Sequence, residues 1–463
     1  MRIGLDAGVS LAASARLWGV LGAVVTIALV VRNFSSVLQG YYYGFLSLLI
    51  LQQLFQTGLS FVLQQFASHE WAQLRIVDGS IVGERSARSR LASLIRLSQR
   101  GFGVTTCAVL AILVLAGPLL FGGREDPGIS WIAPWYILCL VTSLSVLVLP
   151  MSAILEGTGH VASSQRAQLV GAVVSSIGGW AAIVTGLGLY SVAVIVGLRS
   201  AVVALLLAKP YRPFARLRLD PSAGSTIAWK ELWPLQWRLT LSWLTGIVMY
   251  QSMVPLTFQL VGPVAAGQMG LLNQILQAVM AIGGVWLVSA QPRMGRLAAE
   301  RQIEEIRRLT RATAIRCSIT AALTGAVALV SVGIIHWVLP ETGARFGSPW
   351  LLVILLVAAV LIQPAAAMVA AIRFQKKEPF VRLGLVSSLL SIGGMTAGAA
   401  WSGLLGVVVA FTAVVALLIV PWSSAIYRRE MAQEEGGGTA DPKGRNGLST
   451  TVALGSELPP GGI

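Results

Sequence analysis

Residues 42–66 read YYGFLSLLILQQLFQTGLSFVLQQF, a run without one charged side chain. A helix needs about 20 residues to cross the hydrocarbon core of a bilayer, so this run is long enough. Lipid offers the backbone no hydrogen-bond partner, and a spanning segment must therefore satisfy its own N–H and C=O groups as a helix. We interpret residues 42–66 as a transmembrane helix that carries polar side chains on part of its surface.

Similar apolar runs recur along the whole chain. Its 463 residues are 55% hydrophobic and 11% charged, whereas a soluble domain has roughly 25% charged residues. The sequence therefore predicts an all-α polytopic membrane protein with about twelve transmembrane helices. The predicted spans are 15–31, 42–66, 101–121, 132–154, 168–186, 190–208, 239–261, 264–289, 315–338, 350–372, 383–401 and 404–426.

The basic residues favour one side of the membrane. Of the 34 Lys and Arg residues, all but four fall in every second connection between predicted spans. The exceptions are Arg32, Arg124 and Arg345 in the other connections, and Arg199 inside a span. By the positive-inside rule, both termini are expected in the cytoplasm. The net charge of +15 then indicates attraction to anionic phospholipid, and no nucleic-acid partner is expected.

The chain divides into two halves of six predicted helices. We predict an N-terminal lobe at 1–208, a cytoplasmic linker at 209–238, a C-terminal lobe at 239–429 and a disordered cytoplasmic tail at 430–463. The segment QLFQ at 53–56 corresponds to QILQ at 274–277, about 221 residues later. Since six is an even number, two such repeats would share one orientation, related by an axis along the membrane normal.

Polar residues inside the predicted spans are the first candidates for a binding site, because lipid burial without partners is costly. The second span has Gln53, Thr57, Ser60 and Gln64 on one helical face, with Gln52 and Gln56 adjoining it. The seventh span has Tyr250 and Gln251, and the eighth has Gln274 and Gln277. Such amides and hydroxyls can line a glycan path. They can equally be hydrogen-bond contacts between packed helices.

Three arginines are candidates for contact with an anionic group. Arg199 lies inside the sixth span, and Arg16 and Arg32 lie at the ends of the first. A guanidinium in such a place suits a phosphate or a carboxylate. Structural pairing for Arg199 and interfacial anchoring for Arg16 and Arg32 are the alternatives.

The sequence lacks the signatures of an enzyme and of a metal or cofactor site. No HExxH, GxSxG or Walker A pattern occurs, and the three cysteines show no CxxC spacing. No Asp or Glu lies deep in a predicted span, and Glu156 at an inner end is the nearest. We therefore expect a non-enzymatic protein without a cofactor. Its coupling ion stays open, with Glu156 and the three histidines His69, His160 and His336 as candidate residues.

Residues 40–71, GYYYGFLSLLILQQLFQTGLSFVLQQFASHEW, resemble the second helix and the following inner loop of polysaccharide-repeat (O-antigen type) flippases. These belong to the multidrug/oligosaccharidyl-lipid/polysaccharide exporter superfamily. The resemblance implies two six-helix lobes in a V, as in MATE transporters, around a cavity lined by the first, second, seventh and eighth helices. It also implies a bacterial inner-membrane location and transfer of a polyprenyl-diphosphate-linked oligosaccharide to the outer leaflet for cell-surface polysaccharide biosynthesis. A polysaccharide polymerase and other assembly proteins are the implied partners.

Three other functions remain open at this point. A cation-coupled multidrug exporter of the same fold is the first alternative, although a deep carboxylate would be expected for it. A membrane glycosyltransferase or polymerase would require acidic residues and a larger outer loop. A sugar transporter of a different twelve-helix fold is the last.

Overall fold

The computed structural model describes residues 2–123, 128–217, 248–300, 302–375 and 379–437. Its first half is a helical bundle with one β-hairpin. The elements of this first lobe are α1 (Arg2–Asn33), α2 (Ser36–Leu48), α3 (Ile50–Trp71), β1 (Leu74–Val77), β2 (Ser80–Gly83), α4 (Arg85–Phe121), α5 (Ile132–Ser145), the short 3₁₀ turn η1 (Val146–Val148), α6 (Leu149–Gly157), α7 (Val161–Val184) and α8 (Tyr190–Ala215).

The second half forms a second bundle of helices. After a helical stretch at 248–251, its elements are α10 (Met253–Leu260), α11 (Pro263–Gly283), α12 (Val285–Ala299), α13 (Ile303–Val338), α14 (Pro340–Ala344), α15 (Pro349–Arg373), α16 (Val381–Ser402), α17 (Leu404–Val414), the π-helical turn η3 (Val415–Ile419) and α18 (Val420–Gly437).

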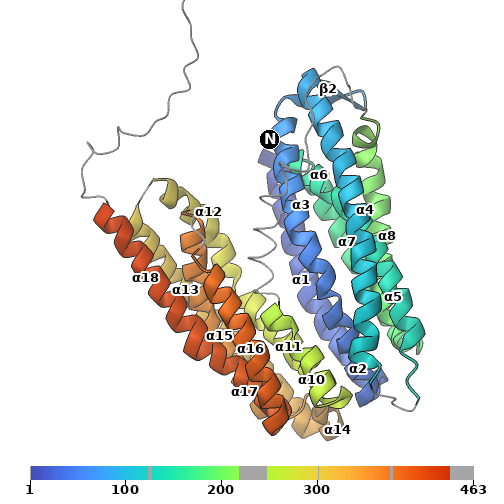
Figure 1. The fold of residues 1–463 in the computed structure, drawn as a ribbon, viewed down its shortest axis with the longest axis vertical. Coiled ribbons are helices and arrows are strands. Elements are labelled where there is room, and N and C mark those ends of the chain that lie inside the picture. The colour runs from blue at the N-terminus through green and yellow to red at the C-terminus, as the bar shows by residue number, and fades with distance from the viewer. Residues whose placement is uncertain (1, 124–127, 218–247, 301, 376–378, 438–463) are drawn as a thin grey trace, which may run out of the picture.

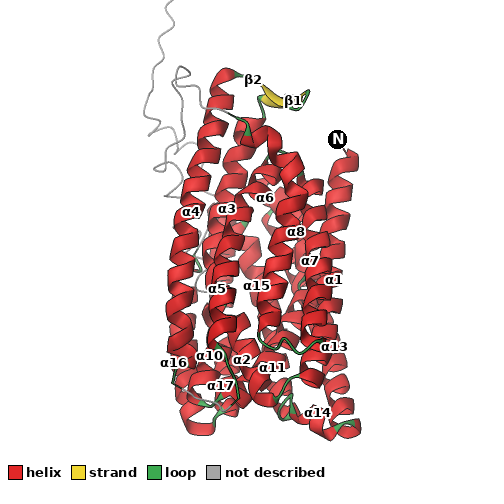
Figure 2. Ribbon diagram, turned by 90° about the vertical axis from the view of Figure 1, so that its right-hand side faces the viewer, coloured by secondary structure: helices red, strands yellow, loops and turns green. Residues whose placement is uncertain are grey.

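The two bundles form a V, the architecture expected from the family resemblance (Figure 1). They converge at one end, where α1, α2 and α4 of the first lobe contact α10 and α11 of the second. Toward the other end, which holds the β-hairpin and α12, the two lobes diverge. Seen from the side, the long helices run roughly parallel, with the hairpin at one end of the bundle (Figure 2). We call the end where the lobes converge the joined end, and the end where they diverge the open end.

Most predicted spans correspond to long apolar helices. Among the described residues, eight helices are long and apolar enough to cross a membrane, and α11 with α12 makes a ninth if this pair, bent by 41°, is one span. The total of twelve spans stays a prediction. The seventh span, predicted at 239–261, lies partly outside the described residues.

Several spans are broken where the sequence weakens the helix. Pro150 follows the 3₁₀ turn η1 and occupies the first turn of α6, where a missing N–H is tolerated. Pro255 lies in the first turn of α10, directly after a turn at Ser252. Pro364 stays inside α15, which continues through it as one helix. The second predicted span is also divided into α2 and α3, at Leu49, although the sequence has no proline or glycine at this break.

The predicted loop at 67–100 is more ordered than expected and adds a small β element to the all-α prediction. The two strands pair antiparallel, with Leu74 opposite Gly83 and Val77 opposite Ser80. Asp78 and Gly79 form the turn with φ of 49° and 72°, as a two-residue hairpin with this strand twist requires. Leu74 and Ile81 are buried in a cluster with Phe214 of α8, which attaches the hairpin to the first lobe.

Two predicted boundaries also differ from the structure. α8 continues to Ala215, inside the range predicted as linker, and the remaining part of that range from residue 218 onward lies outside the described residues. α18 continues to Gly437, so residues 430–437 of the predicted disordered tail are helical. The rest of the tail, from residue 438, lies outside the described residues.

Candidate functional site

At the joined end, α2 and α11 cross almost backbone to backbone. A Cβ added at Gly40 would lie 1.9 Å from the carbonyl oxygen of Pro263, and one at Gly270 would lie 2.2 Å from Cγ of Tyr43. A Cβ at Gly267 would lie 3.0 Å from the backbone nitrogen of Gly40. Small residues at such a crossing let helices in lipid gain close van der Waals contact. At Gly40 and Gly270 the lobes therefore meet at positions that only glycine fits, whereas a small side chain at Gly267 needs a shift of only a few tenths of an ångström.

An aromatic cluster continues this contact between the lobes. Phe258 of α10 packs against Tyr41 of α2 and Phe121 of α4, with ring centroids 5.0 and 5.1 Å apart and both pairs edge to face. Tyr41 and Phe121 also stack on each other at 5.5 Å. Edge-to-face rings contribute about 0.5–1.5 kcal/mol per pair beyond the area they bury. One side chain of the second lobe is thus enclosed by the first.

Uncharged polar groups make the hydrogen bonds between the lobes. Gln259 Nε2 donates to the carbonyl of Leu119 at 2.8 Å, and Gln39 Nε2 donates to the carbonyl of Arg345 at 3.4 Å. The Tyr43 hydroxyl donates to Gln274 Oε1, also at 3.4 Å. Two of these three bonds are long, so the contact includes weak polar interactions as well as close packing.

Some buried polar atoms at or near this contact have no hydrogen-bond partner among the described residues. They are Gln39 Oε1, Asn273 Oδ1 of α11 and Arg345 Nη1. A buried polar atom left without a partner costs about 1–3 kcal/mol. The joined end therefore combines tight packing with groups that would gain partners if water entered between the lobes.

Of the predicted site residues, Gln274 lies at the lobe contact, on α11. The half-buried Tyr250 instead packs edge to face on Phe411 of α17 within the second lobe, with the centroids 5.6 Å apart. Gln251 and Gln277 are half-buried in the same lobe. The side chains of Arg16, Gln53 and Gln56 lie outside the described residues, so their roles stay predictions.

The two predicted arginines with described side chains are exposed. Arg32 is in the last turn of α1. Arg199 lies on α8, which packs on α5, α6 and α7 of the same lobe, and its Nη2 donates to Gln168 Oε1 at 3.4 Å. The structure does not bring these arginines together with Gln274.

The structure gives Gln52 one of the two roles left open above and adds a backbone contact at Arg345. Gln52, expected beside the polar face of the second span, is buried and donates to Ser145 Oγ at 2.7 Å inside the first lobe. It is a contact between packed helices, because no part of this bond reaches the other lobe. Arg345, in one of the connections with few basic residues, supplies the carbonyl that Gln39 binds.

The arginine-rich segments lie at the open end. The start of α4 follows the hairpin, and α12 leads directly into the start of α13, so these helix ends of the two lobes face the same side (Figure 1). Arg88, Arg96 and Arg100 belong to α4, Arg293 and Arg296 to α12, and Arg308 to α13. Like charges on both lobes repel each other, which favours separation unless an anion lies between them.

Comparisons with known proteins identify the fold. No protein-family model matches the sequence, and no curated protein matches it. Among solved structures, the lipid II flippase MurJ in an inward closed conformation has a TM-score of 0.60 at 13% identity, covering 94% of this chain and 90% of MurJ. An inward-facing multidrug resistance MATE family transporter of the MOP superfamily has 0.58 at 14%, covering 88% and 96%. The MATE multidrug transporter DinF-BH has 0.58 at 14%, covering 92% and 95%.

The chain therefore has the MATE-like fold. Similarity over about nine-tenths of each chain means that the whole two-lobed arrangement is shared, and the neighbours are transporters and a flippase. At this level of identity the comparison concerns the fold, and the cargo has to be argued from the residues of this chain.

Proposed function

We propose that the protein is a flippase that moves a polyprenyl-diphosphate-linked oligosaccharide from the cytoplasmic to the outer leaflet by alternating access. The observation that carries the proposal is the distribution of side chains along the lobes. Guanidinium groups gather where the lobes diverge, and amides, hydroxyls and aromatic rings occupy the joined end. A cargo with an anionic head group and a neutral glycan would meet matching groups at both levels.

The transport cycle follows from the physical chemistry of the two ends. Arginines at the open end would attract the diphosphate, and its negative charge would reduce the repulsion that separates the lobes. The glycan would then exchange hydrogen bonds with neutral amides such as Gln274, Gln277 and Gln251. As the joined end opens, partnerless atoms such as Gln39 Oε1 would gain water, which offsets part of the lost packing. The lipid tail would stay in the bilayer throughout.

We assign the open end to the cytoplasm on the positive-inside rule, because it carries most of the basic residues. Both termini would then be cytoplasmic in a bacterial inner membrane. Such a flippase would deliver its cargo to enzymes that polymerise or ligate the glycan on the outer face. Its partners would therefore include a polysaccharide polymerase and other assembly proteins.

A cation-coupled multidrug exporter is the second candidate, favoured by the equally good structural match to MATE transporters. Such an exporter would need a group that binds the coupling ion. Glu156 at the end of α6 is the nearest carboxylate, and its Oε1 already accepts from Ser164 Oγ at 2.8 Å and Gln165 Nε2 at 3.1 Å. His336 also has local contacts, with ring nitrogens 3.1 and 3.0 Å from the carbonyls of Val332 and Gly347.

Reconstitution in liposomes distinguishes the two functions. One set would contain a fluorescent polyprenyl-diphosphate oligosaccharide, and a parallel set would test uptake of a cationic dye under proton and sodium gradients. We expect the labelled lipid to reach the opposite leaflet faster than in protein-free liposomes, with no gradient-driven dye transport. Dye transport together with an unchanged rate for the lipid would overturn the proposal in favour of the exporter.

Single substitutions test the glycan and head-group residues. We expect Gln53→Ala and Arg199→Ala to slow lipid transfer while leaving membrane insertion unchanged, because each removes a polar side chain whose place in a predicted span made it a candidate for cargo contact. Gln65→Ala, at an exposed position later in α3, is the matched control and should retain the wild-type rate. Wild-type rates in both test variants would remove these two residues from the path.

A further inference from the structure

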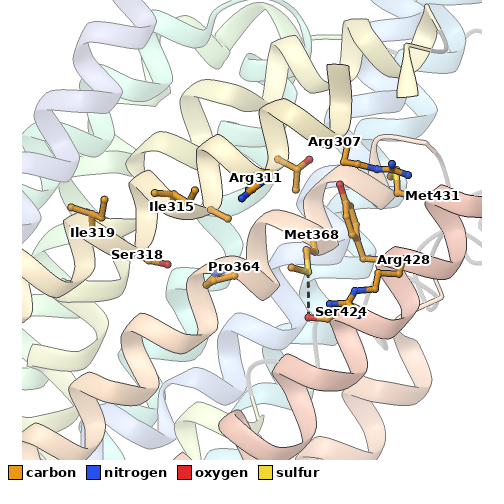
Figure 3. A pocket seen from close by; sticks show the side chains of 13 residues that line it. Arg307, Arg311, Ile315, Ser318, Ile319, Pro364, Met368, Ser424, Arg428 and Met431 are labelled. Atoms are coloured by element: carbon orange, nitrogen blue, oxygen red, sulfur yellow. Dashed lines mark hydrogen bonds between the residues drawn. The ribbon is translucent and has the colours of Figure 1, made fainter. Parts of the chain in front are cut away.

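A cavity among the described residues lies inside the second lobe. It has a volume of about 800 Å³ and is bounded by α13, α15 and α18, whereas the lobe contact is made by α2, α10 and α11 (Figure 3). We call it the α13–α18 groove. Because none of its lining residues takes part in the lobe contact, its occupant does not have to be the transported cargo.

One end of the groove is cationic. Arg307 and Arg311 of α13 and Arg428 of α18 line it, and Figure 3 shows Arg307 and Arg428 together at one end. Arg307 lies 3.7 Å from Glu304. Arg311 and Arg428 are exposed and have no carboxylate at ion-pair distance within the part of the chain that the structure describes. Two guanidinium groups on different helices are thus available to a shared anion.

The other end of the groove is apolar. Ile315 and Ile319 of α13 form one wall, and Pro364 and Met368 of α15 line the groove with them (Figure 3). Ile315 and Ile319 are 51% and 55% exposed, and exposed apolar residues continue along α13 at Leu323 and Val327. In a membrane-spanning helix, a stripe of this kind faces lipid. The groove therefore leads from an arginine pair into the acyl-chain region.

The arginines lie at the depth expected of lipid head groups. Arg311 is one helical turn before Ile315, where the predicted ninth span begins, and Arg428 lies near the end of the last span. Ser424 and Tyr427 of α18 also line the groove, and the buried Tyr427 hydroxyl, which has no hydrogen-bond partner among the described residues, can donate to an ester or phosphate oxygen. A ligand that matches the cationic end, the polar hydroxyl groups and the apolar end must have an anionic phosphate, a polar link and a hydrocarbon chain.

We propose that the α13–α18 groove is a binding site for an anionic phospholipid, distinct from the transport path. The phosphate is held by Arg311, Arg428 and Arg307, and one acyl chain lies along Ile315, Ile319 and Met368. A lipid bound in this way links α13 to α18 across the groove. A free phosphate would leave the apolar part unfilled, and a neutral lipid would leave the guanidinium groups without a counter-charge.

Native mass spectrometry of the purified full chain tests the site. Phosphatidylglycerol and phosphatidylcholine with the same acyl chains would be titrated in parallel, with inorganic phosphate as a competitor. We expect one tightly held phosphatidylglycerol, roughly 30-fold weaker binding in the Arg311→Gln/Arg428→Gln double variant, and no displacement by inorganic phosphate at millimolar concentration. Equal retention of both lipids by the wild-type protein would overturn the proposal.

Neighbouring arginines supply a matched control. Arg308→Gln/Arg429→Gln removes the same charge from the same two helices, but neither residue lines the groove. This control should weaken binding by less than about 3-fold. Ser318→Trp keeps every arginine and fills the apolar part, so it should also release the lipid. Wild-type binding of phosphatidylglycerol by both the groove double variant and Ser318→Trp would contradict the proposed site. Binding weakened as much in the control as in the groove double variant would also contradict it.

Discussion

The two ends of the molecule hold the lobes in opposite ways. At the joined end, glycines let α2 and α11 touch, and Phe258 of one lobe is enclosed by rings of the other. At the open end, the lobes diverge and both carry arginines (Figure 1). Short-range packing disappears once helices separate by a few ångströms, whereas charge repulsion acts over about 8–10 Å at physiological salt. The joined end can therefore open completely, whereas the separation of the lobes at the open end depends on the charge of a bound ligand.

The largest expected effect is that of adding a side chain where the helix backbones touch. Gly40→Val should prevent the joined end from closing, because its Cβ would lie 1.9 Å from a backbone oxygen that has little room to move. We expect transport to be abolished and the joined arrangement destabilised by roughly 3 kcal/mol or more. Lipid transfer in liposomes measures the first, and spin-label distances across α2 and α11 measure the second.

Gly103→Val is the control for this change. It also places a β-branched residue in a membrane helix of the first lobe, but nothing lies within 4 Å of its added Cβ. Near-normal transport is expected of it. Normal transport by Gly40→Val would mean that the backbone contact at the joined end is not needed.

Truncating Phe258 should have the next largest effect. Phe258→Ala removes a fully buried ring and its two edge-to-face contacts, and should weaken the joined end by about 3 kcal/mol. Spin-label distances should then show a larger fraction of molecules with this end open. Phe258→Leu, which fills much of the same volume, should lose less. Equal distance distributions for wild type and Phe258→Ala would contradict the role of this ring.

Acid pH should distinguish the two ends. His160 lies between α6 and α7, its ring packs against Trp71 and Phe214 at 5.9 Å each, and burial lowers its pKa below the usual value near 6.5. The folded lobe therefore favours neutral His160. The stability that the partly buried neutral ring of His160 contributes is fully present above about pH 6.5. It is lost as the pH falls through the lowered pKa of His160.

Thermal unfolding at about pH 7.5 and about pH 5 tests this expectation. The wild type should lose more stability on acidification than His160→Gln, and spin-label distances at the joined end should change little in either protein. If both proteins respond equally to acid, the protonation of His160 is not the cause.

The smallest expected effect concerns the bond between Tyr43 and Gln274. At 3.4 Å it is long, and hydrogen bonds between membrane helices average about 0.6 kcal/mol. A double-mutant cycle with Tyr43→Phe and Gln274→Leu, scored by the open fraction of the joined end, should give a coupling of about that size. A coupling above about 2 kcal/mol would mean that polar bonds, rather than packing, hold this end together.

The sequence predicts the membrane helices well because hydropathy is a local property that lipid enforces. The sequence also contains local signals for two features of the fold. The Asp78-Gly79 turn is a recognised hairpin pattern, and the Gly40 to Gly44 spacing is the small-residue motif of close helix packing.

The joined end could not be predicted in the same way, because its contacts depend on which distant helices cross. Nothing in the sequence near Phe258 indicates that Tyr41 and Phe121 will enclose it. The glutamines of the second span illustrate the same limit, since Gln52 turned out to bond Ser145 within its own lobe. Gln274, by contrast, was identified by its polarity and does lie at the contact.

The most direct test of the account is to lock the joined end and measure transport. A Cβ at Gly267 would lie 3.3 Å from Cγ of Gln39, which is the position that Sγ of a cysteine at 39 would occupy. This separation is close to that of a disulfide, so Gln39→Cys/Gly267→Cys should cross-link α2 to α11 on oxidation. The exposed Cys107 would first be replaced by Ser. We predict that the oxidised protein does not transfer the lipid-diphosphate oligosaccharide and that reduction restores transfer. Undiminished transfer by the fully cross-linked protein would contradict the opening of the joined end.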